Sequence, residues 1–167
     1  MADAIQFVFR HEHLIIDAEL KAKLAFPRRR AITTNLIEKL LHELGMERLA
    51  PLGIYDATDP RFPGWSFIQP ITTSHISGHY FEEVNAPSHI HMDVYSCKEY
   101  RWQNIFPILD EALKLDQWSA NLVIRSAKIA QETHKVMTGK EANIIVILDM
   151  AFPRNIVKSG GAQQRVD

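Results

Sequence analysis

The sequence predicts an α+β fold, a two-layer sandwich in which helices cover one face of a largely antiparallel sheet. Three observations lead to this prediction. An apolar strand pattern opens the chain, an amphipathic helix follows it, and several consecutive strand patterns then precede a second amphipathic helix. Strands that follow one another through short turns pair antiparallel. The helices are then left on one side of the sheet, and a partner subunit can cover the other side.

The first third of the chain is predicted to contain one strand and one helix. The segment from His13 to Leu20 favours a strand, and Arg28 to Arg30 are expected in a solvated loop. Thr33 or Thr34 is a suitable N-cap for a helix that ends at Gly45. The apolar residues of this helix recur at helical spacing and are Leu36, Ile37, Leu40, Leu41 and Leu44.

The middle of the chain is predicted to form most of the sheet. Turn-forming residues are dense from Asp56 to Gly64, which indicates a loop, and a second turn is expected at Asn85 to Pro87. The strands predicted around these turns are Leu52 to Tyr55, Ser66 to Ile71, His75 to Phe81 and His89 to Cys97.

The last third is predicted to alternate helices and strands. An amphipathic helix is expected from Trp102 to Leu115, and a strand from Ala120 to Ile124. A further helix is predicted from Lys128 to Met137, ending before Gly139. The apolar run from Ile144 to Leu148 favours a buried strand.

The bulk composition indicates one soluble domain that spans residues 1–167. A formal net charge of -1 gives no general attraction to nucleic acid or to an anionic membrane. The longest apolar run, Ile144 to Leu148, is too short to cross a bilayer. The first residues lack a signal-peptide pattern, and the single cysteine, Cys97, excludes an internal disulfide. We therefore expect a cytoplasmic protein.

Reactive side chains are concentrated between Ser66 and Cys97. Because side chains alternate along a strand, His75, Ser77 and His79 are expected on one face. The same rule groups five side chains on one face of the following strand, namely His89, His91, Asp93, Tyr95 and Cys97. Polar groups at such positions line a site or bond to one another. The sequence therefore points to chemistry on this part of the sheet.

These residues allow three interpretations, and the first two are a metal site and a cysteine hydrolase. His89 and His91, with a carboxylate nearby, are typical of zinc or iron sites in small β-folds, although such pairs are more often surface residues. Cys97 as nucleophile with His79 as base would suit a hydrolase. A lone cysteine is, however, usually a small buried apolar residue, and no hydrolase signature surrounds it.

The third interpretation is self-processing at the bond between Thr73 and Ser74. The Ser74 hydroxyl attacks the carbonyl carbon of Thr73 and forms an ester. Elimination from that ester then leaves a dehydroalanine, which hydrolyses to a pyruvoyl group. The reaction needs a strained or polarised peptide bond, a donor to the oxyanion, and a base for the α-proton. Ser66 and His79 are candidates for the last two roles.

The segments GWSFIQPITTSHISGHYFEE and SHIHMDVYSC resemble the bacterial and archaeal S-adenosylmethionine decarboxylases, which are pyruvoyl-dependent enzymes. Relative to Ser74, Ser66 lies eight residues before, His79 five after and Glu83 nine after, all in the register of that family. The resemblance spans about residues 10–126, and its clear motifs lie between residues 64 and 97. A C-terminal extension at about 127–158 and a loose tail at 159–167 go beyond it.

This resemblance implies a function, a cofactor and an assembly. The proenzyme would cut itself before Ser74 into chains 1–73 and 74–167, and Ser74 would become a covalent pyruvoyl group. That group forms a Schiff base with the substrate and accepts its electrons during decarboxylation. The implied pathway is polyamine (spermidine) biosynthesis, and the implied assembly is a homodimer of four layers.

The resemblance also implies roles for single residues. Ser66 and His79 would assist processing, and Cys97 would return a proton to the substrate carbon. Glu83 would hold the substrate. An aromatic side chain before Ser66 would stack on the adenine, for which Phe62 and Trp65 are candidates that lie outside perfect register. No metal is implied.

Departures from the family pattern leave two alternatives open. Thr73 stands where the family commonly has an acidic residue, and the segment from Tyr80 to Glu83 lacks the family's proline. A relative with a changed loop would decarboxylate ornithine or arginine, with Glu82 or Asp59 facing the distal cation. An uncleaved homologue would instead serve as a subunit or regulator without catalysis.

Overall fold

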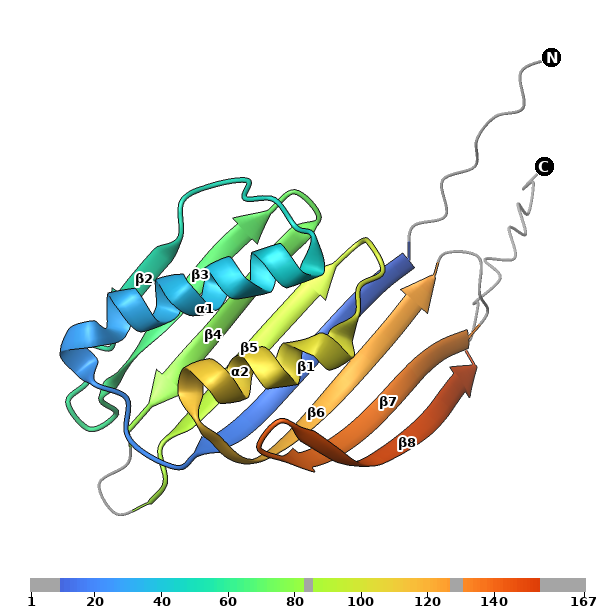
Figure 1. Cartoon of the computed structure of the whole chain (residues 1–167). Helices are drawn as coiled ribbons and strands as arrows, with labels where there is room; N and C mark the ends of the chain where they lie inside the picture. The colour runs from blue at the N-terminus through green and yellow to red at the C-terminus, as the bar shows by residue number, and fades with distance from the viewer. Residues whose placement is uncertain (1–9, 83–85, 127–130, 154–167) are drawn as a thin grey trace, which may run out of the picture.

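The computed structural model describes residues 10–82, 86–126 and 131–153. Its main layer is an eight-stranded sheet with the strand order β2-β3-β4-β5-β1-β6-β7-β8, in which every neighbouring pair is antiparallel (Figure 1). The strands are β1 (Arg10–Leu20), β2 (Gly53–Asp56), β3 (Gly64–Ile71), β4 (Ser74–Phe81), β5 (His89–Ser96), β6 (Leu115–Ser126), β7 (Gln131–Lys140) and β8 (Asn143–Pro153).

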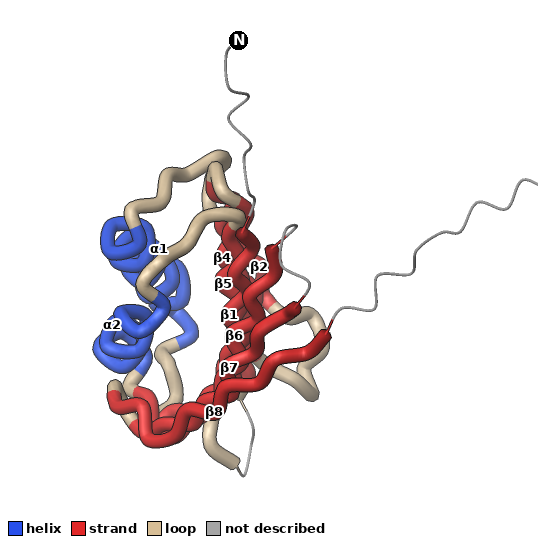
Figure 2. The backbone as a smooth tube through the Cα atoms, turned by 90° about the vertical axis from the view of Figure 1, so that its right-hand side faces the viewer, coloured by secondary structure: helices blue, strands red, loops and turns tan. Residues whose placement is uncertain are grey.

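The second layer consists of helices on one face of the sheet. Within the described residues the α-helices are α1 (Arg29–Leu44) and α2 (Ile105–Leu113), preceded by the short 3-10 helices η1 (Phe26–Arg28) and η2 (Trp102–Asn104). Figure 2 shows both α-helices on the same side of the strands. The predicted α+β two-layer sandwich is confirmed. We call the opposite side of the sheet, on which none of the described helices lies, the open face.

The hydrophobic core lies between the two layers. On β1 the even-numbered residues from Leu14 to Leu20 are buried, while the odd-numbered residues between them lie on the open face. The predicted apolar stripe of α1 is buried against this side of the sheet, and Gly45 ends the helix with φ 59. Burial also alternates along β4 and β5, which confirms the predicted face-sharing of their histidines.

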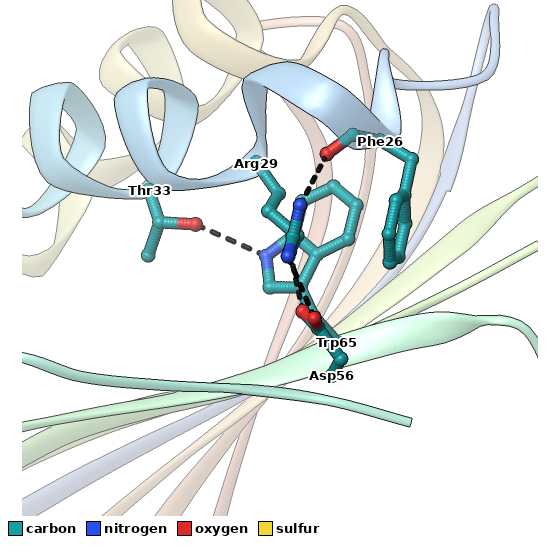
Figure 3. Close-up of polar contacts among 5 residues, drawn as sticks. All are labelled: Phe26, Arg29, Thr33, Asp56 and Trp65. Carbon is teal, nitrogen blue, oxygen red and sulfur yellow. Dashed lines mark hydrogen bonds and ion pairs between the residues drawn. The ribbon is translucent and has the colours of Figure 1, made fainter. Parts of the chain in front are cut away.

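Two predictions about the start of α1 are wrong. Arg29 begins the helix instead of lying in a loop, because its guanidinium forms an ion pair with Asp56 of β2 and lies 4.4 Å over the Phe26 ring (Figure 3). Thr33 does not cap the helix. It is 2% exposed inside α1, and its hydroxyl accepts a 3.0 Å hydrogen bond from the indole N–H of Trp65. Tertiary contacts therefore extend the helix toward the N-terminus.

The predictions for the C-terminal extension need two corrections. The helix predicted at Lys128 to Met137 is replaced by β7 over the part that the structure describes, because this segment pairs with β6 and β8 on its two sides. The strand predicted at Ile144 to Leu148 is present in β8 but is not buried. It lies at the sheet edge, and Leu148 is 58% exposed.

No helix among the described residues is both long and apolar enough to cross a membrane.

Candidate functional site

The turn between β3 and β4 has an unusual backbone. Thr72 and Thr73 connect the paired residues Ile71 and Ser74, so the hairpin has a two-residue loop. Such loops ordinarily take positive φ angles within the loop itself. Here the positive φ falls on Ser74, at 151°. That region favours glycine, so the backbone at Ser74 is strained.

The carbonyl of Thr73 is polarised by the neighbouring strand. Ser74 lies opposite Ser96 at the end of β5, and Cys97 follows directly. The backbone N–H of Cys97 donates a 2.9 Å hydrogen bond to the Thr73 carbonyl oxygen. The Thr73 hydroxyl is buried and has no hydrogen-bond partner among the described residues. The peptide bond between Thr73 and Ser74 therefore combines strain with a donor on its oxygen.

Aromatic and histidine side chains gather beside this bond on the open face. The Tyr95 ring lies 5.6 Å from the His75 ring and 5.2 Å from the His13 ring, measured between centroids. The Tyr95 hydroxyl is hydrogen-bonded to Nδ1 of His11 at 2.8 Å. Nε2 of His13 lies 2.9 Å from a carboxylate oxygen of Asp93. These side chains come from three adjacent strands and border the turn.

Ser66 and His79 form a pair at the other end of the same hairpin. They lie opposite each other on β3 and β4, and the Ser66 hydroxyl is 2.7 Å from Nδ1 of His79. His79 faces His91 on β5, and His91 in turn contacts Asp17 on β1. His79 lies five positions after Ser74 on the same strand, a distance of about 16 Å. Within one chain the pair therefore does not reach the Thr73 carbonyl.

A cavity of about 600 Å³ adjoins the His79 end of the open face. Its volume is in the range of small-molecule sites. Two acidic side chains, Asp17 and Glu19, and two histidines, His89 and His91, contribute to its lining. Glu19 accepts a 2.8 Å hydrogen bond from the amide of Gln117, which also borders the cavity. Asp17 in turn contacts His91, so the lining combines two carboxylates with two imidazole rings.

The two aromatic candidates differ in their exposure. Phe62, in the loop before β3, is 59% exposed and is available to a ligand. Trp65 is 2% exposed and faces the helices, where its ring lies 4.3 Å from the ring of Tyr80. Trp65 therefore offers no ring face to the open side of the sheet.

The carboxylate candidates for holding the substrate are either paired or outside the described residues. Glu83 lies outside them. Glu82 accepts a 3.3 Å hydrogen bond from the Tyr80 hydroxyl and lies 3.6 Å from the Lys23 ammonium. Asp59 is paired with Arg61 at 2.6 Å, and this partner lowers the pKa of the Asp59 carboxyl. These pairings give no specific support to an ornithine or arginine substrate.

Sequence reasoning missed a buried acid near the turn. Glu12 on β1 is 1% exposed, and burial raises the pKa of its carboxyl, although nearby Arg10 opposes the change. Burial also raises the pKa of the neighbouring Tyr100 hydroxyl, and the charge of Glu12 adds to this effect. The alternation of the strand contained the signal, because Glu12 has the same parity as buried Leu14 and Ile16.

No group of three or more His, Cys, Asp or Glu side chains suited to a metal ion occurs in residues 10–82, 86–126 and 131–153. Of the two histidines considered as ligands, His91 contacts Asp17. The His89 and His91 rings are 5.1 Å apart between centroids.

A comparison with protein families gives one match over this part of the chain. The family model for S-adenosylmethionine decarboxylase matches residues 12–126, which is more than half of the chain. The match ends at the last residue of β6, so β7 and β8 lie beyond it. None of the curated proteins compared with the chain matches it.

Proposed function

We infer the function from one premise: this chain belongs to the S-adenosylmethionine decarboxylase family. Its function is therefore of the S-adenosylmethionine decarboxylase type. We propose more specifically that the chain cuts itself between Thr73 and Ser74 and uses the resulting pyruvoyl group to decarboxylate S-adenosylmethionine in polyamine (spermidine) biosynthesis. The observation that carries this proposal is the Thr73–Ser74 bond, which is strained at Ser74 and polarised by Cys97.

The first step is a shift of the acyl group from nitrogen to oxygen. Ser74 Oγ attacks the Thr73 carbonyl carbon, and negative charge develops on the carbonyl oxygen. The Cys97 N–H already donates to that oxygen, so it would stabilise the developing charge. The carbon–nitrogen bond then breaks, the Ser74 nitrogen takes up the hydroxyl proton, and an ester remains. Strain at Ser74 is released in this step because the peptide bond no longer exists.

The second step is elimination from the ester. A base removes the α-proton of Ser74, the bond between Cβ and the ester oxygen breaks, and the Thr73 carboxylate leaves as the new C-terminus. Water then replaces the nitrogen, which departs as ammonia, and a pyruvoyl group remains on the second chain. A histidine is the side chain best suited to remove such a proton near neutral pH.

The assignment of Ser66 and His79 to processing requires a second subunit. The pair lies about 16 Å along the hairpin from Ser74 of its own chain. We propose that two sheets pack face to face as a homodimer, so that the Ser66–His79 pair of one subunit meets the Thr73–Ser74 bond of the other. The histidine-rich open face supports this assembly, because none of the helices that the structure describes covers it.

Cys97 and the cavity supply the remaining parts of the proposed reaction. The pyruvoyl group would supply an electron sink while carbon dioxide leaves the substrate. Cys97, directly beside the turn, would give its thiol proton to the substrate carbon. Because the cavity lies at the His79 end, the cavity of one subunit would serve the pyruvoyl group of the other in the proposed dimer. Its Asp17 and Glu19 carboxylates would face the sulfonium and ammonium charges of S-adenosylmethionine. Exposed Phe62 remains the candidate for stacking on the adenine, and Glu83 remains a proposed substrate contact.

An intact mass spectrum of the denatured protein tests the proposal. We expect two chains, 1–73 and 74–167, with the larger one lighter by one ammonia than a simple hydrolysis product. The purified protein should then release carbon dioxide from carboxyl-labelled S-adenosylmethionine and not from ornithine or arginine.

A Ser74→Ala variant is the matched control, because it removes one hydroxyl oxygen. It should give a single full-length chain without activity. A wild-type protein that stays in one piece would contradict the self-processing proposal and favour a non-catalytic homologue. Two chains in Ser74→Ala would show that cleavage has another cause.

A further inference from the structure

The turn that carries Cys97 is tied to the structure on both sides of that residue. The Ser96 hydroxyl accepts a 3.0 Å hydrogen bond from the backbone N–H of Lys98. Farther along, the Tyr100 hydroxyl donates a 2.8 Å hydrogen bond to the carbonyl of Val94, which is back on β5. Ser96 and Tyr100 are both buried. The Cys97 N–H that bonds to Thr73 is therefore held between two anchored residues.

Glu12 lies beneath this turn, in line with the processing serine. In the strand register Glu12 lies opposite Ser96, and Ser96 lies opposite Ser74. One carboxylate oxygen of Glu12 accepts a long hydrogen bond of 3.4 Å from the backbone N–H of Tyr100. The buried acid on β1 is therefore connected to the far end of the turn.

Arg10 extends the same connection to the middle of the turn. Its Nε lies 2.7 Å from the second carboxylate oxygen of Glu12, and its NH1 lies 3.4 Å from the carboxylate of Glu99. The contact with Glu12 is close but lacks the alignment of a hydrogen bond. Arg10 is half exposed and Glu99 mostly exposed, whereas Glu12 is buried. Of the three charges, only Glu12 is thus removed from solvent.

Burying a carboxylate costs free energy unless specific contacts compensate for the hydration that it loses. Burial raises the pKa of Glu12, which records that the charged form is poorly solvated there. The other inward-facing residues of β1 from Leu14 onward are apolar, so packing in the core does not require an acidic residue at position 12. The contacts that Glu12 makes are to the turn and to Arg10.

We propose that Glu12 is a positioning residue for self-processing: through Tyr100 and Arg10 it holds the turn at 96–100, so that the Cys97 N–H stays on the Thr73 carbonyl oxygen. This inference rests on the proposed function and adds a residue to it. Glu12 does not touch the reacting atoms. It acts on the first step, because the oxyanion develops on the oxygen that the Cys97 N–H contacts.

Ester formation in freshly synthesised full-length protein measures this step directly. The protein is made by cell-free translation, sampled over time, and treated under denaturing conditions with hydroxylamine, which cuts esters but not ordinary peptide bonds. At each time, the amount of cleaved chain is compared between samples treated with hydroxylamine and untreated samples. This comparison gives the rate of ester formation. We expect Glu12→Leu, which removes both contacts, to slow ester formation about tenfold. Glu12→Gln keeps an oxygen for the Tyr100 N–H, and we expect a loss of about threefold.

The matched control is Glu111→Leu. Glu111 on α2 is paired with Lys39 at 2.6 Å and is 64% exposed, so the same substitution there removes a charge far from the turn. This control should form ester at the wild-type rate. Wild-type rates in Glu12→Leu would overturn the proposal. If Glu12→Leu fails to fold, a folded Glu12→Gln that forms ester at the wild-type rate would overturn it equally.

Hydrogen exchange separates failure of this inference from failure of the proposed function. In a Ser74→Ala background, which cannot be cut, adding Glu12→Leu should speed amide exchange in the peptide spanning residues 96–100, whereas adding Glu111→Leu should not. Unchanged exchange would overturn the positioning role while leaving self-processing intact. If the wild-type chain is never cut, the proposed function falls and this role falls with it, whatever the exchange result.

Discussion

The two ends of the β3–β4 hairpin contribute different things to one proposed reaction. The turn end has the strained Ser74, the Cys97 N–H on the Thr73 carbonyl, and the Cys97 thiol nearby. The other end has the Ser66–His79 pair and a cavity with acidic walls. Five residues would span only about 7.5 Å in a helix, but in a strand they span about 16 Å. A compact sequence motif is therefore divided into two sites by the extended backbone.

Mixing two defective chains tests this division with the largest expected effect. We expect Ser74→Ala alone to stay uncut, and His79→Ala alone to be cut at least 100-fold more slowly, because it lacks the base. When the two are co-expressed, the Ser74→Ala subunit supplies an intact His79. The His79→Ala chain should then be cut in mixed dimers, which a size tag on one chain makes visible in the mass spectrum.

Two outcomes of this mixing experiment would contradict the roles proposed for the two ends of the hairpin. Rapid cleavage of His79→Ala by itself would mean that the Ser66–His79 end takes no part in processing, and would favour a base near the turn such as His75. A mixture in which neither chain is cut, although mixed dimers are present, would mean that the two ends do not act between subunits.

A Cys97→Ala variant separates the backbone and side-chain roles of one residue at the turn end. The backbone N–H remains, so cleavage before Ser74 should proceed within a few-fold of the wild-type rate. Decarboxylation should fall about 100-fold, because the proton donor is lost. Chain masses and release of labelled carbon dioxide measure the two effects. Full activity in the cut variant would remove Cys97 as the donor.

Strain at the turn end predicts a smaller effect on stability. We expect Ser74→Gly and Ser74→Ala both to stay uncut, but only glycine accepts a φ of 151° without a steric penalty. We therefore expect the glycine variant to exceed the alanine variant by about 1 kcal/mol in free energy of unfolding. Urea denaturation of the two uncut proteins measures the difference. Equal stabilities would mean that the backbone at Ser74 is not strained.

The smallest predicted effect is a pH dependence that arises from Glu12. The pKa of Glu12 is raised in the folded protein above its ordinary value of 4.5. The folded state therefore binds the carboxyl proton of Glu12 more tightly than the unfolded state does. The associated stability is present at low pH and is lost as the pH rises through the folded pKa. The test compares two uncut proteins, Ser74→Ala and the double variant Ser74→Ala with Glu12→Gln. The free energy of unfolding of Ser74→Ala minus that of the double variant should fall as the pH rises from 4.5 through the folded pKa of Glu12.

The same denaturation series in the Glu111→Gln variant checks the sign. The pKa of Glu111 is lowered by its hydrogen bond to Lys39, so any contribution from this exposed group is lost as the pH falls. A difference between the parent and Glu12→Gln that does not change with pH, or that grows as the pH rises, would contradict the burial of a poorly solvated carboxylate at Glu12.

The local patterns of the sequence were sufficient for the fold class and for most of the elements. Alternation predicted the strands around Ser66–Cys97, and the apolar spacing predicted α1 and α2. Local patterns failed where a distant partner decides. The segment at 131–137 is a strand because β6 and β8 pair with it, and Arg29 begins a helix because Asp56 binds its side chain. The residues adjacent in sequence to residues 131–137 and to Arg29 do not indicate either contact.

The sequence by itself determined which residues are proposed to react and their spacing, because the proposed chemistry depends on residue type and order along the chain. Only the tertiary structure decided which of them meet. Antiparallel pairing brought Cys97 to the Thr73 carbonyl, although the two are far apart in sequence, and kept His79 away from Ser74, although the two are close. It also buried Glu12 beneath the Cys97 turn. The physical reason is the strand itself, in which neighbours across the sheet lie closer together than residues a few positions along it.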